Sequence, residues 1–241
     1  SIADGKLGLD TRVSEQIPEF KEGQRGQVTV RMLANHTSGI HPDHVTMTKK
    51  TILASTLSGP QVFKPGSRFQ YNNGAVDLLG LVIGRAMGQQ IDTLLQRRIF
   101  SRLGFKGASI YPDRDGIPRG TGEVFIRAVD LAKLGQLMLD EGLWNGQQLL
   151  PAAWIKESTA VAQPFNADYG LLWWLVGDFA FTLTKTVLAA WADAGVAPET
   201  VRKARSLEGK VFKDREALKE ALILAVGDEA RLPLLRILYR G

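Results

Sequence analysis

The stretch NGAVDLLGLVIGRAMG, residues 73–88, constrains the fold more than any other part of the sequence. Its apolar residues recur at helical spacing and cover a wide surface, made by Val76, Leu78, Leu79, Leu81, Val82, Ile83, Ala86 and Met87. A helix whose apolar surface is that wide must be packed on most sides, because exposing it to water is costly. The sequence therefore predicts a central and largely buried helix over 73–88.

Helical patterns also dominate the rest of the chain, and strand signals are few. Thr29 is expected to cap a short helix that Gly39 ends. Pro151 suits the first position of another helix. The predicted helices beyond 88 in the first part of the chain lie at about 91–103, 128–141 and 151–159. We therefore expect the chain as given to be mostly α.

The character of the sequence changes after the aromatic stretch YGLLWW, residues 169–174. From about residue 184 onward, nearly every segment has the pattern of a charged amphipathic helix, punctuated by glycine and proline. We expect two domains: residues 1–175, and a helical insertion or appended subdomain over 176–241.

Composition excludes several classes of protein. The 241 residues are 44% hydrophobic and 23% charged, which is typical of a globular protein with one large domain or two small ones. The absence of cysteine excludes disulfides, thiol catalysis and thiolate metal sites. The net charge of +5 comes from scattered residues, so no nucleic-acid partner is expected. No apolar stretch approaches the roughly 20 residues of a membrane span.

Most motifs that could carry chemistry have a simpler explanation. His36, His41 and His44 could approach a metal, but a proline places the last two in a loop with no further ligand signal. Asp113 and Asp115 could be a catalytic carboxylate pair, yet their Pro/Gly-rich surroundings favour a turn. The sequence contains no G-x-S-x-G elbow, no H-E-x-x-H motif and no phosphate-binding glycine loop. No metal and no cofactor are therefore expected.

The stretch FQYNNG, residues 69–74, places a tyrosine and two side-chain amides where one cap residue would be enough to begin the helix. In one interpretation, Asn72 or Asn73 is only an N-cap, and Tyr71 is a core aromatic with a solvated hydroxyl. In the other, these residues belong to a site. An asparagine amide both donates and accepts hydrogen bonds without adding charge, so it can orient an amide or ester group.

Five blocks of sequence occur in an order that points to one protein family far more specifically than any single block does. They are GKLGLDTRVSEQIPEF, VTVRMLANHTSGI, FKPGSRFQYNNGAVDLLGLVIGRAMG, AVDLAKLGQLMLDEGLWNGQQLLPAAW and YGLLWW. Over roughly residues 3–175, the sequence resembles the serine beta-lactamase and penicillin-binding-protein-like family. The resemblance is best to its branch of class C beta-lactamases, D-alanyl-D-alanine carboxypeptidases and esterases. It implies an α+β parent fold, beta-lactamase/transpeptidase-like, whose central antiparallel sheet is made by strands from both chain ends.

The resemblance gives the FQYNNG stretch a role. Its Y-x-N element implies that Tyr71 handles the proton and that Asn73 hydrogen-bonds the carbonyl of the substrate. A serine hydroxyl needs a base to take its proton, and a tyrosine can serve if nearby lysine charge lowers its pKa from about 10. Asn72, Trp173 and Trp174 are further substrate-binding candidates, although large aromatics after a Tyr-Gly pair are also typical of a core.

The family's nucleophile is the serine of an S-x-x-K motif, which occurs nowhere in the 241 residues. The nearest matches, TMTK at 46–49 and TLTK at 182–185, carry threonine in place of serine. Both follow the GKLGLD block, which the family's nucleophile should precede. The resemblance therefore implies a nucleophile that lies ahead of Ser1.

The family's third element, K-T-G or H-x-G on an inner strand, is also expected to be absent. The best match, KTV at 185–187, has valine where close approach of a substrate to the strand favours glycine. Residues 238–241 are expected to enter the missing strand. Without a sheet, the apolar surface of the helix over 74–87 is expected to be exposed and covered by a second copy or a complementing chain.

The resulting hypotheses belong to different classes of function. The first is a serine hydrolase that acts through an acyl-enzyme on an amide, ester or beta-lactam, with its nucleophile outside this chain. The alternatives are a non-catalytic relative or truncated fragment, and a helical interaction module whose tail binds a protein partner. The resemblance implies an exported or periplasmic location, although the given residues contain no signal peptide.

Overall fold

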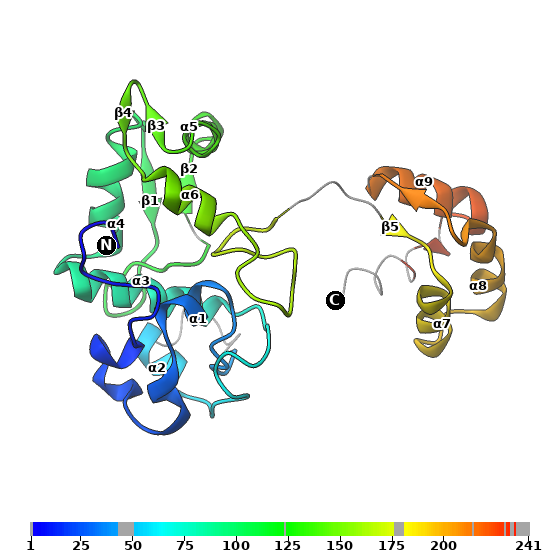
Figure 1. Cartoon of the computed structure of the whole chain (residues 1–241), viewed down its shortest axis with the longest axis horizontal. Coiled ribbons are helices and arrows are strands. Elements are labelled where there is room, and N and C mark those ends of the chain that lie inside the picture. The colour runs from blue at the N-terminus through cyan, green and yellow to red at the C-terminus, as the bar shows by residue number, and fades with distance from the viewer. Residues whose placement is uncertain are drawn as a thin grey trace. The chain divides into compact units, whose positions relative to one another are not determined.

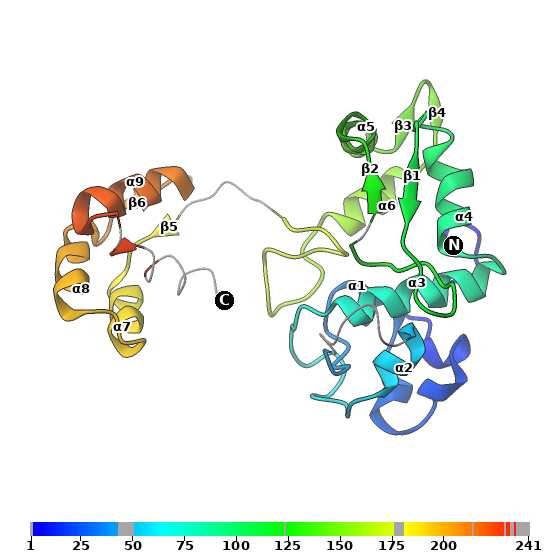
Figure 2. The same cartoon turned by 180° about the vertical axis from the view of Figure 1, so that it is seen from behind.

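The protein, analysed as a computed structural model, forms two compact units, Ser1–Leu175 (unit 1) and Val176–Gly241 (unit 2) (Figures 1 and 2). The structure describes residues 2–42, 51–122, 124–175, 181–213, 215–228, 230, 231 and 234. Helices dominate the described residues of both units, and their strands are two or three residues long. The prediction of a mostly α chain is confirmed. The interpretation of unit 2 as an insertion or appended subdomain stays a prediction.

The central helix α3, Asn73–Met87, lies where the sequence predicts it. All of its residues from 75 to 82 are buried, and Figures 1 and 2 show it crossing the middle of unit 1. Helices α1 (Val30–Ala34) and α2 (Ile52–Leu57) pack against it. Gly88 ends the helix with φ 64°, a left-handed conformation that suits glycine. The expectation that the apolar surface of this helix would be exposed is therefore wrong.

The amino-terminal segment completes the core around α3. It contains 3₁₀ helices at Val13–Glu15, Pro18–Phe20 and Gly23–Gln27. The side chains of Val13, Ile17 and Phe20 are fully buried in one cluster with residues of α1, α2 and α3. Each such burial contributes roughly 1.5–3 kcal/mol to folding. Helices and helical turns therefore supply the core of unit 1.

Helix α1 begins as predicted and ends earlier than predicted. The hydroxyl of Thr29 caps it by accepting the Met32 amide at 3.3 Å. The helix ends at Ala34, because His36 takes the left-handed conformation with φ 58° and the helical hydrogen bonds cannot continue. Gly39 lies in the loop beyond, so the prediction that it ends the helix is wrong.

The other described helices of unit 1 lie in the predicted regions: α4 at Ile91–Leu95, α5 at Ala128–Leu139 and α6 at Ala152–Ser158. After α4 the chain continues as a π-helical turn over Gln96–Phe100, so the helix predicted at about 91–103 is helical to residue 100 and changes from α to π within its length. Pro151 is the N-cap of α6 and not its first helical residue.

The strands of unit 1 form two small antiparallel pairs. β1 (Ala108–Ile110) pairs with β2 (Val124–Ile126), and β3 (Leu143–Trp144) pairs with β4 (Gln147–Gln148). The second pair is a hairpin around Asn145-Gly146, whose φ angles are 49° and 76°. Positive φ at both central residues is the type I′ turn that an Asn-Gly pair favours. This pair is the sequence signal that could have predicted the hairpin.

Asp113 is a turn residue, as predicted, and not a member of a catalytic pair. Its Oδ1 accepts hydrogen bonds from the amides of Asp115 and Ile117, both at 2.9 Å. Its Oδ2 accepts the amide of Ile52 at 2.8 Å. These three backbone donors satisfy the buried carboxylate and fasten the loop to the start of α2.

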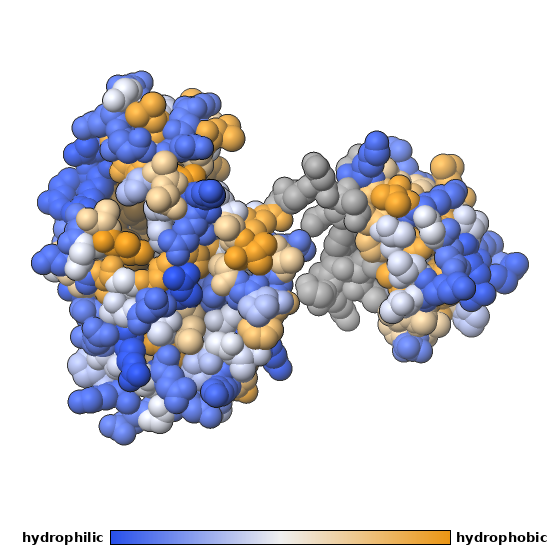
Figure 3. All heavy atoms as spheres, in the orientation of Figure 1, coloured by the Kyte–Doolittle hydropathy of each residue, from blue (hydrophilic) through white to orange (hydrophobic). Residues whose placement is uncertain are grey.

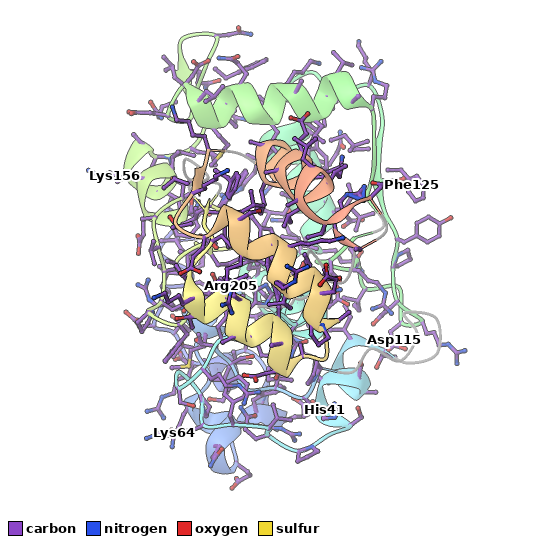
Figure 4. The ribbon with its side chains drawn as sticks, turned by 90° about the vertical axis from the view of Figure 1, so that its right-hand side faces the viewer. His41, Lys64, Asp115, Phe125, Lys156 and Arg205 are labelled. Atoms are coloured by element: carbon purple, nitrogen blue, oxygen red, sulfur yellow. The ribbon has the colours of Figure 1, made fainter. Side chains whose placement is uncertain are left out.

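An apolar surface is exposed elsewhere in unit 1, on α5 and the neighbouring strands. Of the residues in α5, only Asp130 and Leu137 are buried. The exposed apolar residues in this region are Tyr111, Val124, Phe125, Val129, Leu131, Leu139 and Leu143. Figure 3 shows apolar residues interrupting the hydrophilic surface in the upper part of unit 1, and Figure 4 shows Phe125 directed away from the ribbon.

Unit 2 has a core of its own. Its elements are β5 (Phe181–Thr182), α7 (Lys185–Asp193), α8 (Pro198–Ala204), a 3₁₀ helix (Arg205–Leu207), β6 (Val211–Phe212) and α9 (Arg215–Val226). Trp191 is fully buried among Leu183, Leu218 and Leu222. Thr184 caps α7, so the KTV sequence at 185–187 begins a helix and not a strand. Residues 238–241, expected in a strand, lie outside the described residues.

Candidate active site

An aromatic cluster lies where the segment that leads into α3 passes the end of α1. It consists of His36, Phe69, Tyr71, Tyr169 and Trp174. The His36 ring centroid is 4.5 Å from that of Tyr71 and 4.9 Å from that of Tyr169. Trp174 stacks on Tyr71 with 5.9 Å between centroids and 21° between ring planes. The fold thus brings together three segments that are distant in the sequence.

The hydrogen bonds of His36 define its tautomer. The ring is buried, and its Nδ1 accepts the backbone amide of Asn72 at 3.2 Å. A nitrogen that accepts a hydrogen bond carries no proton, so a neutral ring must carry its proton on Nε2. Nε2 lies 2.9 Å from the hydroxyl oxygen of Tyr169 and donates to it. Both ring nitrogens of His36 are therefore satisfied.

Burial shifts the titration of both partners away from neutral pH. Burial lowers the pKa of His36 from 6.5 to about 4, because the low-dielectric surroundings disfavour the imidazolium. Burial is also the main cause that raises the pKa of Tyr169, and the nearby Tyr71 adds to this rise. At neutral pH, His36 is thus a neutral ring and Tyr169 a neutral phenol.

The depressed pKa of His36 predicts a loss of stability in acid. In the unfolded chain His36 binds a proton below about pH 6.5, and in the folded protein only below about pH 4. The contribution of the neutral His36 ring to the free energy of unfolding is therefore complete above pH 6.5 and is lost as the pH falls to 4. This pKa difference corresponds to about 3 kcal/mol of unfolding free energy. Urea unfolding between pH 7 and 4 measures it. His36→Gln should lose this part of the pH dependence; an unchanged dependence in that variant would contradict the prediction.

Asn72 is the N-cap of α3. Its Oδ1 accepts the amide of Ala75 at 3.2 Å, and its Nδ2 donates to the carbonyl of Ile40 at 2.8 Å. The residue is 3% exposed. Its amide group therefore stabilises the start of the helix and the adjoining loop. For Asn72 this agrees with the interpretation that the residue is an N-cap.

Replacing Asn72 with alanine is expected to lower the free energy of unfolding by about 1–2 kcal/mol, because the cap and the bond to Ile40 are both lost. The matched control is Asn73→Ala at the next position, which is exposed and should change stability by no more than about 0.5 kcal/mol. Urea denaturation of the two variants measures the difference. Equal effects would show that the Asn72 side chain contributes nothing specific.

Tyr71 and Asn73 are open to solvent on either side of the buried Asn72. Tyr71 is 47% exposed, and Asn73, the first residue of α3, is also exposed. Their side chains come from the one turn of chain that the Asn72 cap holds in place. The structure therefore places a phenol and an amide, two residues apart in the chain, at an accessible helix start.

Trp173 and Trp174 lie on a tight hairpin that ends unit 1. Tyr169 and Trp174 form an antiparallel bridge, and Leu172 turns the chain with φ 63°. Trp174 is 56% exposed and Trp173 is 37% exposed. Of the two, Trp174 contacts Tyr71. Neither tryptophan is a core residue, although large aromatic residues after a Tyr-Gly pair are typical of a core.

Sequence reasoning missed two members of this cluster. His36 was considered only as a metal ligand, and Tyr169 only as part of an aromatic stretch. Both are buried, so their role depends on neighbours from distant segments, which no local pattern encodes.

Metal and membrane sites find no support in the part of the chain that the structure describes. Its His, Asp and Glu side chains do not gather in groups of three that could hold an ion. None of its helices combines the length and apolarity that crossing a bilayer requires. His44 and the TMTK sequence at 46–49 lie outside the described residues. In the TLTK sequence at 182–185, Thr182 belongs to strand β5 and so does not begin a helix.

A cavity of about 390 Å³ lies along the carboxyl-terminal half of α3. Its walls include Ile52, Leu81, Ile91 and Ile117, and the glycines of α3 leave space beside them. None of the predicted site residues lines it. The cavity is therefore separate from the aromatic cluster. Asp113 and Asp115 also line it, but the Asp113 carboxylate already accepts three backbone amides.

Comparison with known proteins agrees with the arrangement of unit 1. A family model described as Beta-lactamase matches residues 2–191. The esterase EstB of Burkholderia gladioli is 29% identical over 148 residues, which cover 51% of this chain and 38% of that protein. The chain thus spans well under half of the length of this relative.

Two solved structures show a shared fold. A penicillin binding protein from Bacillus halodurans matches with a TM-score of 0.57 at 22% identity, over 70% of this chain and 63% of that one. A D-stereospecific amidohydrolase from Streptomyces sp. matches with a TM-score of 0.57 at 22% identity, over 70% of this chain and 64% of that one. The described helices are consistent with a mostly helical portion of this α+β fold.

Proposed function

The chain belongs to the beta-lactamase family, and we propose that it forms part of a serine hydrolase that acts through an acyl-enzyme on an amide, ester or beta-lactam. The observation that carries the proposal is the accessible pair of Tyr71 and Asn73 at the start of α3, held by a buried Asn72. Relatives named as an esterase and an amidohydrolase support the reaction class.

Tyr71 is proposed as the base. In the first step, the serine oxygen attacks the carbonyl carbon of the substrate while the side-chain oxygen of Tyr71 takes the serine proton. The same proton then passes to the leaving nitrogen or oxygen, and an ester links the acyl group to the serine. Water later cleaves this ester by the reverse sequence of proton transfers. The accessible position of Tyr71 supports this role, since the proton must reach a bound substrate.

Asn73 is proposed to orient the substrate, and Trp173 and Trp174 to contact its apolar part. The exposed amide of Asn73 can hydrogen-bond a carbonyl without adding charge to the site. Trp174, which stacks on Tyr71, offers an aromatic surface beside the reacting group. For Asn72 we propose an indirect role in place of substrate binding, because its amide is buried and already has two partners.

The nucleophile is proposed to come from outside residues 1–241. No S-x-x-K sequence occurs among these residues, and the chain spans only part of its relatives. A serine one helical turn from a lysine would place an amine beside the hydroxyl. Such a pair next to Tyr71 would complete a site for which this chain supplies one wall.

Covalent labelling with a fluorescent penicillin or fluorophosphonate tests the proposal on the protein at its natural length and on residues 1–241 alone. Label on the first and not on the second supports it. Label on residues 1–241 alone would overturn the proposed source of the nucleophile. A folded protein that takes no label at its natural length would overturn the hydrolase and favour a non-catalytic binding role.

A further inference from the structure

We infer that His36 is a positioning residue that holds Tyr71 and the start of α3 in the geometry required for reaction. The inference rests on the proposed role of Tyr71 as the base. His36 is 1% exposed, so it cannot touch a substrate and must act through its neighbours. Its contacts connect the end of α1, the segment before α3 and the 169–174 hairpin.

His36 holds the two residues that flank Tyr71 in the chain. Its carbonyl oxygen accepts the amide of Gln70 at 2.9 Å, and its ring Nδ1 accepts the amide of Asn72 at 3.2 Å. The first bond restrains the peptide group between Phe69 and Gln70, and the second restrains the one between Tyr71 and Asn72. Two bonds from a single buried residue therefore leave the backbone of Tyr71 little freedom to shift.

The ring of Tyr71 is held in the same way. It contacts the imidazole of His36, with 4.5 Å between centroids, and the indole of Trp174, with 5.9 Å between centroids. His36 also controls the second of these contacts, because its Nε2 donates to Tyr169, which pairs with Trp174 across the hairpin. The imidazole therefore contacts the Tyr71 ring itself and helps to fix the indole that stacks on it.

The backbone of His36 supports a functional reason for this arrangement. A non-glycine residue with φ 58° is strained, and such strain persists only where surrounding contacts hold it. Strained residues of this kind are concentrated at active sites. At His36, the strain brings the carbonyl and the ring of one residue to the same segment of chain.

The chemistry of the side chain suggests a matched pair of variants. Glutamine carries both an acceptor and a donor, so His36→Gln can keep hydrogen bonds to Asn72 and Tyr169. Leucine has a similar size and can make neither bond, so His36→Leu removes them. Both variants face the same unfavourable φ, and their comparison therefore isolates the hydrogen bonds from the backbone strain.

Acylation kinetics on the protein at its natural length test the effect on reaction. With a fluorescent penicillin, the acylation rate constant and the dissociation constant of the non-covalent complex are measured separately. For His36→Leu we expect the rate constant to fall about 10²-fold, the cost of a small misplacement of a reacting group, with little change in the dissociation constant. His36→Gln should recover most of the rate. A folded His36→Leu that acylates at the wild-type rate overturns the inference.

NMR tests the positioning independently of activity. In the wild-type protein, ¹⁵N shifts of the His36 ring should report an unprotonated Nδ1 and a protonated Nε2 near neutral pH, and the Asn72 amide should exchange slowly. His36→Leu should lose protection at Asn72 while Leu137 in α5 keeps it. The opposite tautomer, or unchanged protection at Asn72, overturns the inference.

These measurements separate the inference from the proposed function. If the wild-type protein takes no label but the tautomer and the Asn72 protection behave as expected, then the proposed hydrolase fails and the positioning of Tyr71 stands. If His36→Leu does not fold, His36→Gln decides the matter. If folded His36→Gln loses the exchange protection of the Asn72 amide and still acylates at the wild-type rate, the inference is overturned. If the variant keeps both the protection of that amide and the acylation rate, the inference is supported.

Discussion

Replacing Tyr71 with phenylalanine is expected to raise the barrier to acylation by about 3–5 kcal/mol, which is a loss of roughly 10²- to 10⁴-fold in rate. The variant removes only the hydroxyl oxygen, so the ring keeps its stacking on Trp174 and its contact with His36. The loss should therefore appear in the acylation rate constant and not in substrate binding. Rapid-mixing kinetics with a chromogenic beta-lactam or ester, on the protein at its natural length, measure it.

The matched control for this variant is Tyr111→Phe. Tyr111 is 55% exposed and packs its ring against Phe125 on the surface of unit 1, outside the aromatic cluster. Loss of its hydroxyl should leave acylation unchanged. Wild-type acylation by Tyr71→Phe would remove Tyr71 from the mechanism, and the base would then have to be sought among the residues that supply the nucleophile.

Replacing Asp77 with alanine is expected to lower the free energy of unfolding by about 3–5 kcal/mol. Asp77 is buried on α3 and forms an ion pair with buried Arg119 at 2.8 Å. It also accepts hydrogen bonds from the amides of Gly120 (2.9 Å) and Thr121 (3.0 Å) and from the Thr121 hydroxyl (2.7 Å). Removal of the carboxylate breaks an ion pair between two buried side chains, which is far more costly than loss of a surface pair.

Urea unfolding followed by circular dichroism measures this effect, and Asp10→Ala is the control. Asp10 also lies beside an arginine, Arg31 at 3.4 Å, but its side chain is 87% exposed. An exposed pair of this kind contributes no more than about 1 kcal/mol. If the two variants lose similar amounts of unfolding free energy, then the buried ion pair of Asp77 contributes no more to stability than an exposed pair. Recovery of stability in the Asp77→Leu and Arg119→Leu double variant would identify the broken buried ion pair as the cause.

Helices with a strong local cause could be predicted from the sequence. The helix over 73–88 was predicted because its apolar residues cover too wide a surface to face water, and Gly88 ends it as glycine commonly does. Thr29 was predicted as a cap because its hydroxyl satisfies an amide within the same turn. In both cases, the interactions that decide the structure join residues close together in the chain.

Predictions failed where distant contacts decide the backbone. The end of α1 was assigned to Gly39 on residue type, but His36 leaves the helix first, because its ring and carbonyl bond to the segment at 70–72. The exposed apolar surface was assigned to the helix over 74–87, yet α1 and α2 cover that helix. The exposed apolar surface lies instead on α5 and β2, where most apolar side chains are exposed to solvent. The hairpin at Asn145-Gly146 was missed although its signal is local.

The sequence by itself determined the family, the helical character of the chain and the segment in which the site was sought. Each of these depends on residue order or on interactions within a few positions, which a sequence records directly. Only the tertiary structure decided which side chains meet there. It buried Asn72 between two partners, left Tyr71 and Asn73 open to solvent, and brought His36 and Trp174 into contact with the Tyr71 ring. Burial, tautomer and stacking depend on neighbours more than 30 positions away in the chain, so these properties exist only once the fold has brought those neighbours together.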